Sequence, residues 1–246
     1  MSNSFIDVHC HLYLFKEVKR ILDEAEEVGV KYVITNSEDL KSCKRNAELL
    51  ADERVYGAFG IHPQHASKED PSIIKEFLDL EKAVAVGEIG LDYKFARNNI
   101  SKRIQKEIFE KQIIIAEKRH LPIIVHSRYA HKPVIEVLER LRARKVVLHW
   151  FSGSIDLVIR AVKNGWFLSF GPFSLNQAYE KVIEIVPLES MLLETDSPVP
   201  FRGKPVDPSW IPLVAGRIAR IKGIGVEEVA KITTDNAKRL FNLLID

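Results

Sequence analysis

Several histidines and acidic residues stand where short apolar runs of the sequence end, and side chains of these types are common ligands of divalent metal ions. A lone buried histidine or glutamate is usually a satisfied core group, but an unneutralised carboxylate at the end of an apolar strand is costly in free energy unless it is paired or bound to a metal. Several such residues in one chain therefore favour a shared metal site. The candidates are His9, His11, Glu88, His126, His149 and Asp196.

The segment 5–11 is the first of these runs and is predicted to form a strand. Because side chains alternate along a strand, Asp7, His9 and His11 are expected to share one face. Two imidazoles on one face can converge on one ion. The same alternation predicts that Cys10 points toward surrounding helices, where packing explains it better than catalysis.

Four neutral imidazoles and two carboxylates suit two divalent ions such as Zn²⁺, Mn²⁺ or Mg²⁺, with Glu88 bridging them through one oxygen each. Two such ions bring more positive charge than two carboxylates cancel, so a phosphodiester fits the site. The ions can lower the pKa of a shared water and hold a phosphoryl oxygen. Asp196 is expected to accept the proton of the attacking water, and His62 to bind or protonate the phosphate.

The elements that must position these residues are short β-branched runs alternating with longer amphipathic stretches, which is the pattern of parallel strands joined by helices. The expected strands are 4–9, 31–36, 55–61, 83–89, 122–127, 145–150, 166–171 and 191–196. Apolar spacings of three and four residues predict helices at 16–28, 40–51, 101–119, 132–142, 155–163 and 176–186. Two more helices are expected, from about Pro208 and from Val226.

Eight such repeats predict an α/β fold, a single (β/α)8 TIM barrel domain over residues 1–246, whose sites lie at the carboxyl ends of the strands. The candidate ligands fall at such strand ends, so the barrel would bring them together. A doubly wound sheet also alternates strands and helices, but it would need a glycine-rich phosphate loop after its first strand. His9-Cys10-His11 stands at that position instead.

The composition is that of a soluble globular protein, with 46% hydrophobic and 28% charged residues. The formal net charge of +2 means that a nucleic-acid partner would be held by local basic groups or metal ions. Only two cysteines are present, which suits a reducing compartment, so cytoplasm is the expected location. We expect neither a signal peptide nor a membrane span, because no stretch approaches the roughly 20 apolar residues that a span needs.

The motifs around the candidate ligands resemble those of the TatD family of metal-dependent deoxyribonucleases, nearly from end to end. The matching segments are Asp7-x-His9-x-His11, Gly60-Ile61-His62-Pro63, Gly87-Glu88-Ile89-Gly90-Leu91-Asp92-Tyr93, Pro122-Ile123-Ile124-Val125-His126-Ser127-Arg128, His149-Trp150-Phe151-Ser152-Gly153, Glu194-Thr195-Asp196-Ser197-Pro198, Arg202-Gly203-Lys204-Pro205 and Thr234-Asp235-Asn236-Ala237-Lys238-Arg239-Leu240-Phe241.

The resemblance implies an amidohydrolase-superfamily barrel with two divalent ions. One ion would be held by His9, His11, Glu88 and Asp196, and the other by Glu88, His126 and His149. It also implies cleavage of DNA, often from the 3′ end of single strands, with RNA cleaved by some members. This chain departs from the family at Trp150, where cysteine is common, and at Val206, where asparagine is frequent. Trp150 is expected to alter substrate preference by changing the pocket or by stacking on a base.

Further polar residues after the strand ends are expected to contact phosphate or sugar. Together with His62, these are Asp92, Tyr93, Arg128 and Arg202. Two other functions remain open from the residues alone. An ion that polarises a phosphoryl oxygen also polarises a carbonyl, so a cyclic amide or an aminoacyl ester of tRNA is an alternative substrate. A non-catalytic nucleic-acid-binding module is a second alternative, and the full ligand set argues against it.

Overall fold

The computed structural model describes residues 4–245, and its centre is one sheet of eight parallel strands in chain order. The predicted TIM barrel is confirmed, with each strand within a few residues of its expected position. The strands are β1 (Phe5–Cys10), β2 (Val30–Asn36), β3 (Val55–Ala58), β4 (Ala83–Asp92), β5 (Ile123–Arg128), β6 (Val146–Leu148), β7 (Phe167–Phe170) and β8 (Met191–Leu193).

The barrel closes just beyond β8, where the chain returns to β1. The backbone N–H of Asp196 donates to the carbonyl of His9 at 2.9 Å, and the N–H of His11 donates to the carbonyl of Ser197 at 2.8 Å. The two histidines of β1 are thereby tied to the segment that carries Asp196.

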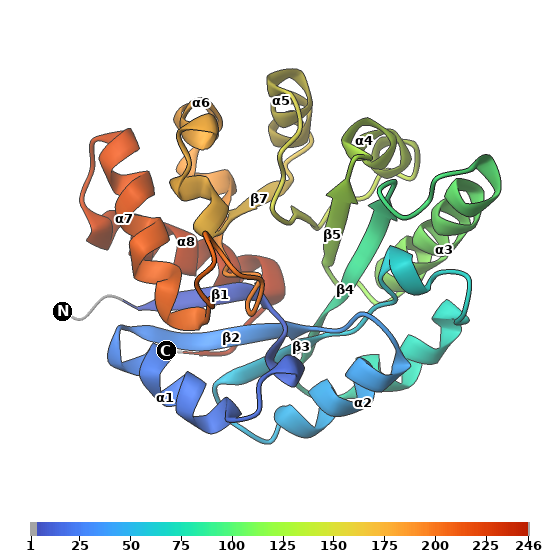
Figure 1. The fold of residues 1–246 in the computed structure, drawn as a ribbon, viewed down its shortest axis with the longest axis horizontal. Coiled ribbons are helices and arrows are strands. Elements are labelled where there is room, and N and C mark those ends of the chain that lie inside the picture. The colour runs from blue at the N-terminus through green and yellow to red at the C-terminus, as the bar shows by residue number, and fades with distance from the viewer. Residues whose placement is uncertain (1–3, 246) are drawn as a thin grey trace.

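The helices lie outside the strands and are arranged around them in Figure 1. They are α1 (Val18–Glu27), α2 (Leu40–Leu49), α3 (Asn99–Lys118), α4 (His131–Arg140), α5 (Ile155–Lys163), α6 (Glu180–Ile185), α7 (Ile211–Lys222) and α8 (Val226–Phe241). The predicted helix 176–186 is shorter than expected, because a 3-10 turn, Gln177–Tyr179, precedes α6. No helix among residues 4–245 is long and apolar enough to cross a membrane.

The connection between β3 and β4 is a 3-10 helix, Pro71–Asp79, for which the sequence analysis gave no helix. Two features mark the start of this helix. The Asp70 side chain accepts a hydrogen bond from the Ser72 N–H, and Pro71 has no N–H that would need an acceptor there. Ile74 and Phe77 are buried on its inner side. This short element therefore covers the barrel at the place of the third crossover helix.

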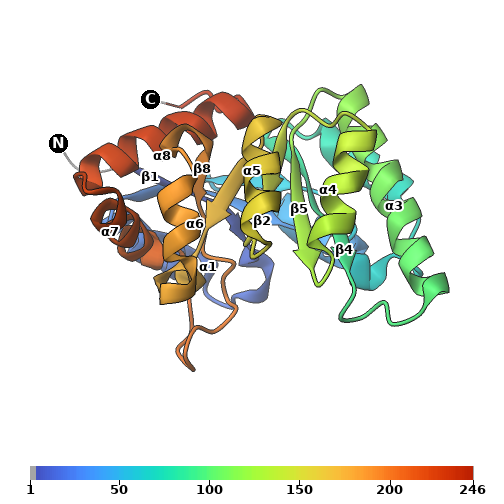
Figure 2. The ribbon, with the colours of Figure 1, turned by 90° about the horizontal axis from the view of Figure 1, so that it is seen from above.

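The barrel interior is a separate apolar cluster. Ile6 and Val8 of β1 pack there with Ile34, and Leu240 and Phe241 of α8 belong to the same cluster. Helix α8 therefore covers one end of the barrel (Figure 2), which leaves the opposite end for the polar site.

The expected strict alternation along β1 is wrong at Asp7. The register against β2 shifts between Asp7 and Cys10, and such an irregularity turns neighbouring side chains out of their regular faces. The Asp7 carboxylate accepts hydrogen bonds from the N–H and hydroxyl of Thr195 and does not join the histidines. Cys10 packs among the residues under the helices, as predicted, with its thiol 3.7 Å from the Ile34 carbonyl.

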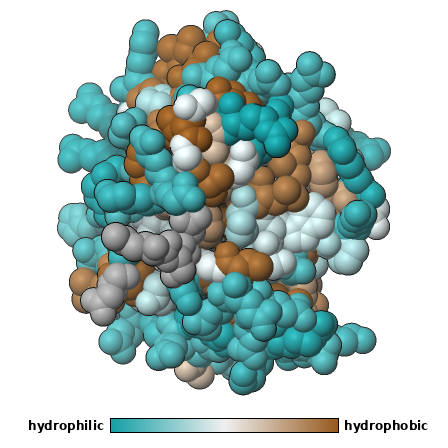
Figure 3. Space-filling view, turned by 90° about the vertical axis from the view of Figure 1, so that its left-hand side faces the viewer, coloured by the Kyte–Doolittle hydropathy of each residue, from teal (hydrophilic) through white to brown (hydrophobic). Residues whose placement is uncertain are grey.

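The face beside the chain termini is covered mostly by hydrophilic side chains, with hydrophobic side chains gathered in smaller patches between them (Figure 3).

Candidate metal centre

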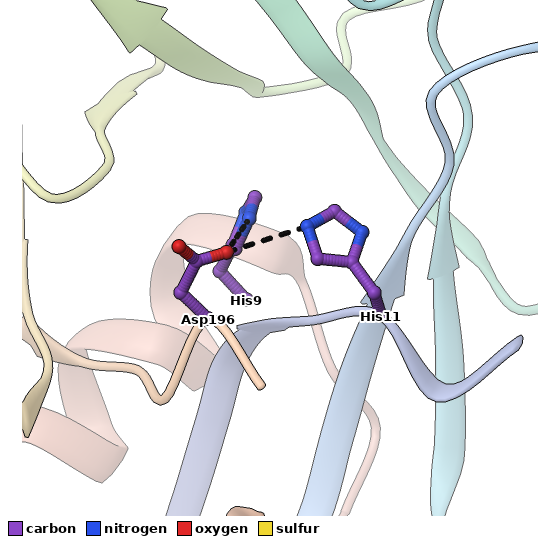
Figure 4. A group of neighbouring side chains, drawn as sticks. All are labelled: His9, His11 and Asp196. Carbon is purple, nitrogen blue, oxygen red and sulfur yellow. Dashed lines mark ion pairs between the residues drawn. The ribbon is translucent and has the colours of Figure 1, made fainter. Parts of the chain in front are cut away.

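His9, His11 and Asp196 converge at the end of β1, and Figure 4 shows the Asp196 carboxylate facing both rings. The Nε2 atoms of His9 and His11 each lie 3.3 Å from Asp196 Oδ1 and 3.5 Å from Glu88 Oε2. Four ligands bound tetrahedrally at about 2.0–2.1 Å would lie about 3.3–3.4 Å apart. We call these three residues, with Glu88 Oε2, the first group; its spacing fits one cation.

The tautomers in the first group also suit a cation. The His11 Nδ1 lies 3.1 Å from the carbonyl oxygen of Asn36 and can donate its proton there, which leaves the lone pair of Nε2 facing the group. Both ring nitrogens of His9 are buried without a hydrogen-bond partner. A buried polar atom without a partner is uncommon, and a bound ion at Nε2 would satisfy one of these two.

Glu88 faces a second set of imidazoles with its other oxygen. Glu88 Oε1 lies 2.7 Å from His126 Nδ1 and 3.0 Å from His149 Nε2. We call His126 and His149, with Glu88 Oε1, the second group. The two oxygens of one carboxylate therefore face two groups, which is the arrangement that a bridging ligand needs.

Glycine at position 90 lets β4 and β5 approach closely beside this carboxylate. Gly90 has φ +144°, and a Cβ there would lie 2.1 Å from the carbonyl oxygen of His126. Any other residue would push the two strands apart. The glycine therefore helps to set the short distance between Glu88 and His126.

Two further carboxylates support the second group from behind. Asp92 Oδ2 lies 3.0 Å from His126 Nε2 and 2.8 Å from Arg128 Nη2. Glu194 Oε1 lies 3.5 Å from His149 Nδ1 and accepts the backbone N–H of Trp150 at 2.8 Å. Carboxylates in this position fix the orientation of ligating imidazoles.

His62 lies beside the second group, with Nε2 3.8 Å from Glu88 Oε1. The backbone N–H of Gln64 donates to His62 Nδ1 at 3.2 Å, so the proton of the neutral ring is on Nε2. Burial lowers the pKa of His62 to about 3, which keeps the ring neutral. His62 is thus arranged to donate a hydrogen bond, and this geometry favours binding a phosphate over ligating a cation or supplying a proton.

The imidazoles of the centre keep its carboxylates ionised. Burial by itself raises the pKa of Glu88, but the neighbouring imidazoles, His149 foremost, outweigh it and hold that pKa well below its usual range. Burial likewise opposes charge on His11, but hydrogen bonding to Asp196 and the charge of Glu88 raise its pKa to about 9. In the metal-free protein a proton therefore occupies the place that a cation would take.

These groups open into a cavity of about 480 Å³ at the carboxyl ends of the strands. Arg128 and Trp150, two of the residues predicted to affect substrate binding, line it. The cavity also includes two residues that were not predicted from the sequence, Glu38 after β2 and His131 at the start of α4. Glu38 stands after an apolar strand, the same signal that indicated the six candidate ligands. His131 does not stand directly at the end of an apolar strand, so its position in the sequence did not mark it as a site residue. In the structure its Nδ1 lies 2.9 Å from the Ser127 hydroxyl.

Three of the expected substrate contacts are not placed in this cavity. Asp92 is fully buried, with Oδ2 turned to both His126 and Arg128. Tyr93 packs beneath the Lys102 ammonium, and Arg202 donates to the Asn176 side chain at 3.0 Å. Asp92 follows Glu88 by four residues on a strand longer than predicted, so its carboxylate supports the site from within the sheet.

A barrel that presents imidazoles and carboxylates at its strand ends defines this protein as a metal-dependent hydrolase. A family model described as TatD related DNase matches residues 6–242, and the chain belongs to the TatD family. The predicted family is thereby confirmed.

Individual relatives cover nearly the whole chain. The uncharacterized metal-dependent hydrolase YabD of Bacillus subtilis is 36% identical, over 96% of this chain and 98% of its own length. Human deoxyribonuclease TATDN3 is 34% identical, over 96% of this chain and 94% of its own. The crystal structure of YJJV, a TatD homologue from Escherichia coli, matches with a TM-score of 0.89 and 29% identity, covering 99% of this chain and 100% of that one.

Proposed function

We propose that this protein uses two divalent cations to hydrolyse phosphodiester bonds of DNA, as a 3′–5′ exonuclease on single strands, with RNA as a further substrate. The observation that carries the proposal is the position of Glu88, with Oε2 facing His9 and His11 and Oε1 facing His126 and His149. His9, His11 and Asp196 would hold one cation, and His126 and His149 the other. The deoxyribonuclease name of human TATDN3 supports DNA as the substrate.

Bound divalent cations would supply Lewis acidity, withdrawing charge from a phosphoryl oxygen and lowering the pKa of water. Zn²⁺, Mn²⁺ and Mg²⁺ are all compatible with imidazole and carboxylate ligands, Mg²⁺ less readily than the others.

The role of proton acceptor falls to Asp196. The His11 and His9 rings, each with Nε2 3.3 Å from Oδ1, outweigh the effect of burial and lower the pKa of this carboxyl, which stays ionised. Oδ1 is turned to the two rings, and the residue lines the cavity where substrate and water must meet. An ionised carboxylate at that place can take the proton of an attacking water.

Two donors are arranged to bind the phosphate. The N–H at His62 Nε2 points into the cavity beside Glu88. Arg128 lines the same cavity, and Asp92 holds its guanidinium through Nε at 2.9 Å and Nη2 at 2.8 Å. A guanidinium fixed in this way loses little side-chain entropy when it binds a phosphate oxygen.

The test uses protein stripped of metal, to which Mg²⁺, Mn²⁺ or Zn²⁺ is restored separately. A single-stranded oligonucleotide labelled at its 5′ end should shorten one nucleotide at a time, only with metal. We expect Glu88→Ala to reduce the rate at least about 100-fold, whereas Glu107→Ala, on the exposed side of α3, should match the wild type. Release of the labelled 5′ nucleotide first would contradict the direction of cleavage.

If the wild type binds metal but cuts no oligonucleotide with any of the three ions, the DNA assignment is wrong. Esters and amides with a polarisable carbonyl would then be tested with the same pair of variants.

A further inference from the structure

A strongly basic stretch follows the strand that carries Glu88. Segment 93–106 runs from the end of β4 into the first two turns of α3 and contains no acidic residue. Its basic residues are Lys94, Arg97, Lys102, Arg103 and Lys106. Because it begins at the carboxyl end of β4, it lies at the same end of the barrel as the metal centre. The overall charge of +2 conceals this local concentration.

An exposed aromatic ring lies within this stretch. Phe95 is 51% exposed, which is unusual for so large an apolar side chain. The Arg128 guanidinium lies over its ring, 4.9 Å from the centroid. Asp92 holds Arg128 through both Nε and Nη2, and the Phe95 N–H lies 3.4 Å from Asp92 Oδ1. One buried carboxylate therefore fixes a cation beside an exposed aromatic ring.

Phe95 also lines a second cavity, of about 140 Å³, between the loop after β3 and the start of α3. Its walls are largely apolar, with Pro63, Ala66, Ala96 and Ile104 among them. Gln64 lines both this cavity and the metal cavity, so the two adjoin. Cavities of roughly 150 Å³ accept a single six-membered aromatic ring, and the second cavity is of that size.

We propose that Phe95, Arg128 and the second cavity form a binding subsite for the nucleotide adjacent to the one in the metal cavity. The base stacks against Phe95 at the mouth of the second cavity, and Arg128 binds the phosphate that joins the two nucleotides. Lys94 and Arg97 neutralise phosphates further along the strand. This inference rests on the proposed nuclease function and gives it a substrate class, single-stranded nucleic acid of at least two nucleotides.

The chemistry of the subsite favours a single strand over a duplex. An aromatic platform next to an arginine is typical of proteins that bind unpaired bases without reading their sequence. In a duplex the bases stack on one another, so Phe95 would have no face to contact until the strand end separated. The ring stacks on any base, so the subsite should be tolerant of sequence.

The test is the dependence of binding on oligonucleotide length. Fluorescently labelled oligothymidylates of one to four nucleotides, with phosphorothioate linkages to slow cleavage, would be titrated with protein in Mg²⁺ buffer and followed by anisotropy. Base stacking on an aromatic ring contributes about 1–3 kcal/mol. The wild type should therefore gain about 5- to 150-fold in affinity from the mononucleotide to the dinucleotide or trinucleotide.

Phe95→Ala should lose most of that gain, and Phe95→Trp should keep it, because tryptophan preserves the stacking face. Ile114→Ala is the matched control, since Ile114 is exposed near the other end of α3. If Phe95→Ala retains the wild-type gain, the subsite does not exist. If Phe95→Trp loses the gain as fully as Phe95→Ala, stacking is not its basis.

The basic residues give an independent readout. Each phosphate contact to a single strand contributes about −0.7 to the slope of log affinity against log salt concentration. Replacing Lys94 and Arg97 together by glutamine should make the slope for a tetranucleotide shallower by about 1.4. An unchanged slope would show that neither residue contacts the phosphates of the nucleic-acid strand.

Failure of the subsite and failure of the proposed function are distinguishable, because this assay measures binding and the nuclease test measures cleavage. A wild type that cleaves single strands while Phe95→Ala keeps the full length dependence would overturn the subsite alone. A wild type that shows the Phe95-dependent gain but cleaves nothing would overturn the nuclease assignment alone.

Discussion

The two groups of imidazoles that share Glu88 differ in how ready they are for a cation. In the first group, the nitrogens of His9 and His11 lie 3.3–3.5 Å from the oxygens of Asp196 and Glu88, which is the spacing of ligands around an ion. In the second group, His126 Nδ1 and Glu88 Oε1 are 2.7 Å apart, the distance of a charged hydrogen bond. The ligand atoms of the first group are already spaced for a cation, whereas His126 and Glu88 of the second group are held together by a shared proton.

The residues that orient the imidazoles also differ between the two groups. His11 is oriented by a neutral backbone carbonyl, at Asn36. His126 and His149 are each backed by a carboxylate, Asp92 and Glu194. Backing by a carboxylate makes an imidazole more basic, which strengthens both proton and metal binding. Proton competition should therefore distinguish the two groups, with the first binding its cation more readily near neutral pH.

The largest expected effect is on catalysis and comes from the first group. Asp196→Asn keeps the size of the side chain but removes its negative charge and its ability to accept a proton. We expect the rate of oligonucleotide cleavage to fall about 100- to 10,000-fold, the usual contribution of a general base. Asp235→Asn is the matched control, because Asp235 forms only an exposed ion pair with Lys231. Equal rates for the two variants would remove Asp196 from the mechanism.

The next expected effect separates the two groups by metal affinity. Calorimetric titration of metal-stripped wild type should give two binding events. His11→Ala should abolish the tighter event and His126→Ala the weaker one, because only the first group is already spaced for an ion. His120→Asn, at an exposed histidine outside the site, should leave both events in place. Loss of the tighter event in His126→Ala would show that the second group, and not the first, binds its cation more tightly.

A smaller effect is expected behind the second group. Asp92→Asn weakens the support of His126 and the hold on Arg128, and loss of such a partner typically costs about 10- to 100-fold in metal affinity or activity. The weaker binding event should shift while the tighter one does not. A change in melting temperature without any change in metal affinity would show that Asp92 only stabilises the fold.

The smallest effect is the pH dependence of metal binding. In the metal-free protein the pKa of His11 is raised to about 9, whereas burial lowers that of His9, so below pH 9 a cation in the first group displaces one proton. Burial opposes charge on both His126 and His149, but their carboxylate partners outweigh it and raise both pKa values, so at a pH where both rings are protonated the second group releases two protons. Affinity should fall with falling pH by about tenfold per unit in the first group and more steeply in the second. Equal slopes of log metal affinity against pH for the two groups would contradict the predicted difference in proton release.

The strand ends explain why the sequence predicted both the barrel and the convergence of the six candidate ligands. A run such as 122–127 is apolar up to His126, and a parallel barrel brings every such end to one face. The six side chains needed no long-range information beyond the strand count. The same rule applies to Glu38, which was overlooked although it follows β2 directly.

Loop residues and local irregularities were less predictable. Tyr93 and Arg202 lie close to ligands in sequence, but their contacts with Lys102 and Asn176 depend on how the loops fold back. Asp7 left its expected face because the register of β1 shifts after it, and no residue type marks that shift. His131 reaches the cavity only because α4 starts beside it.

The central claim is that Glu88 bridges two cations, and anomalous diffraction from crystals grown with Mn²⁺ or Zn²⁺ tests it most directly. We predict two anomalous peaks roughly 3.5–4 Å apart. One should lie beside His9, His11 and Asp196, and the other beside His126 and His149, with one Glu88 oxygen on each. A single peak, or two peaks of which only one contacts Glu88, would contradict the claim.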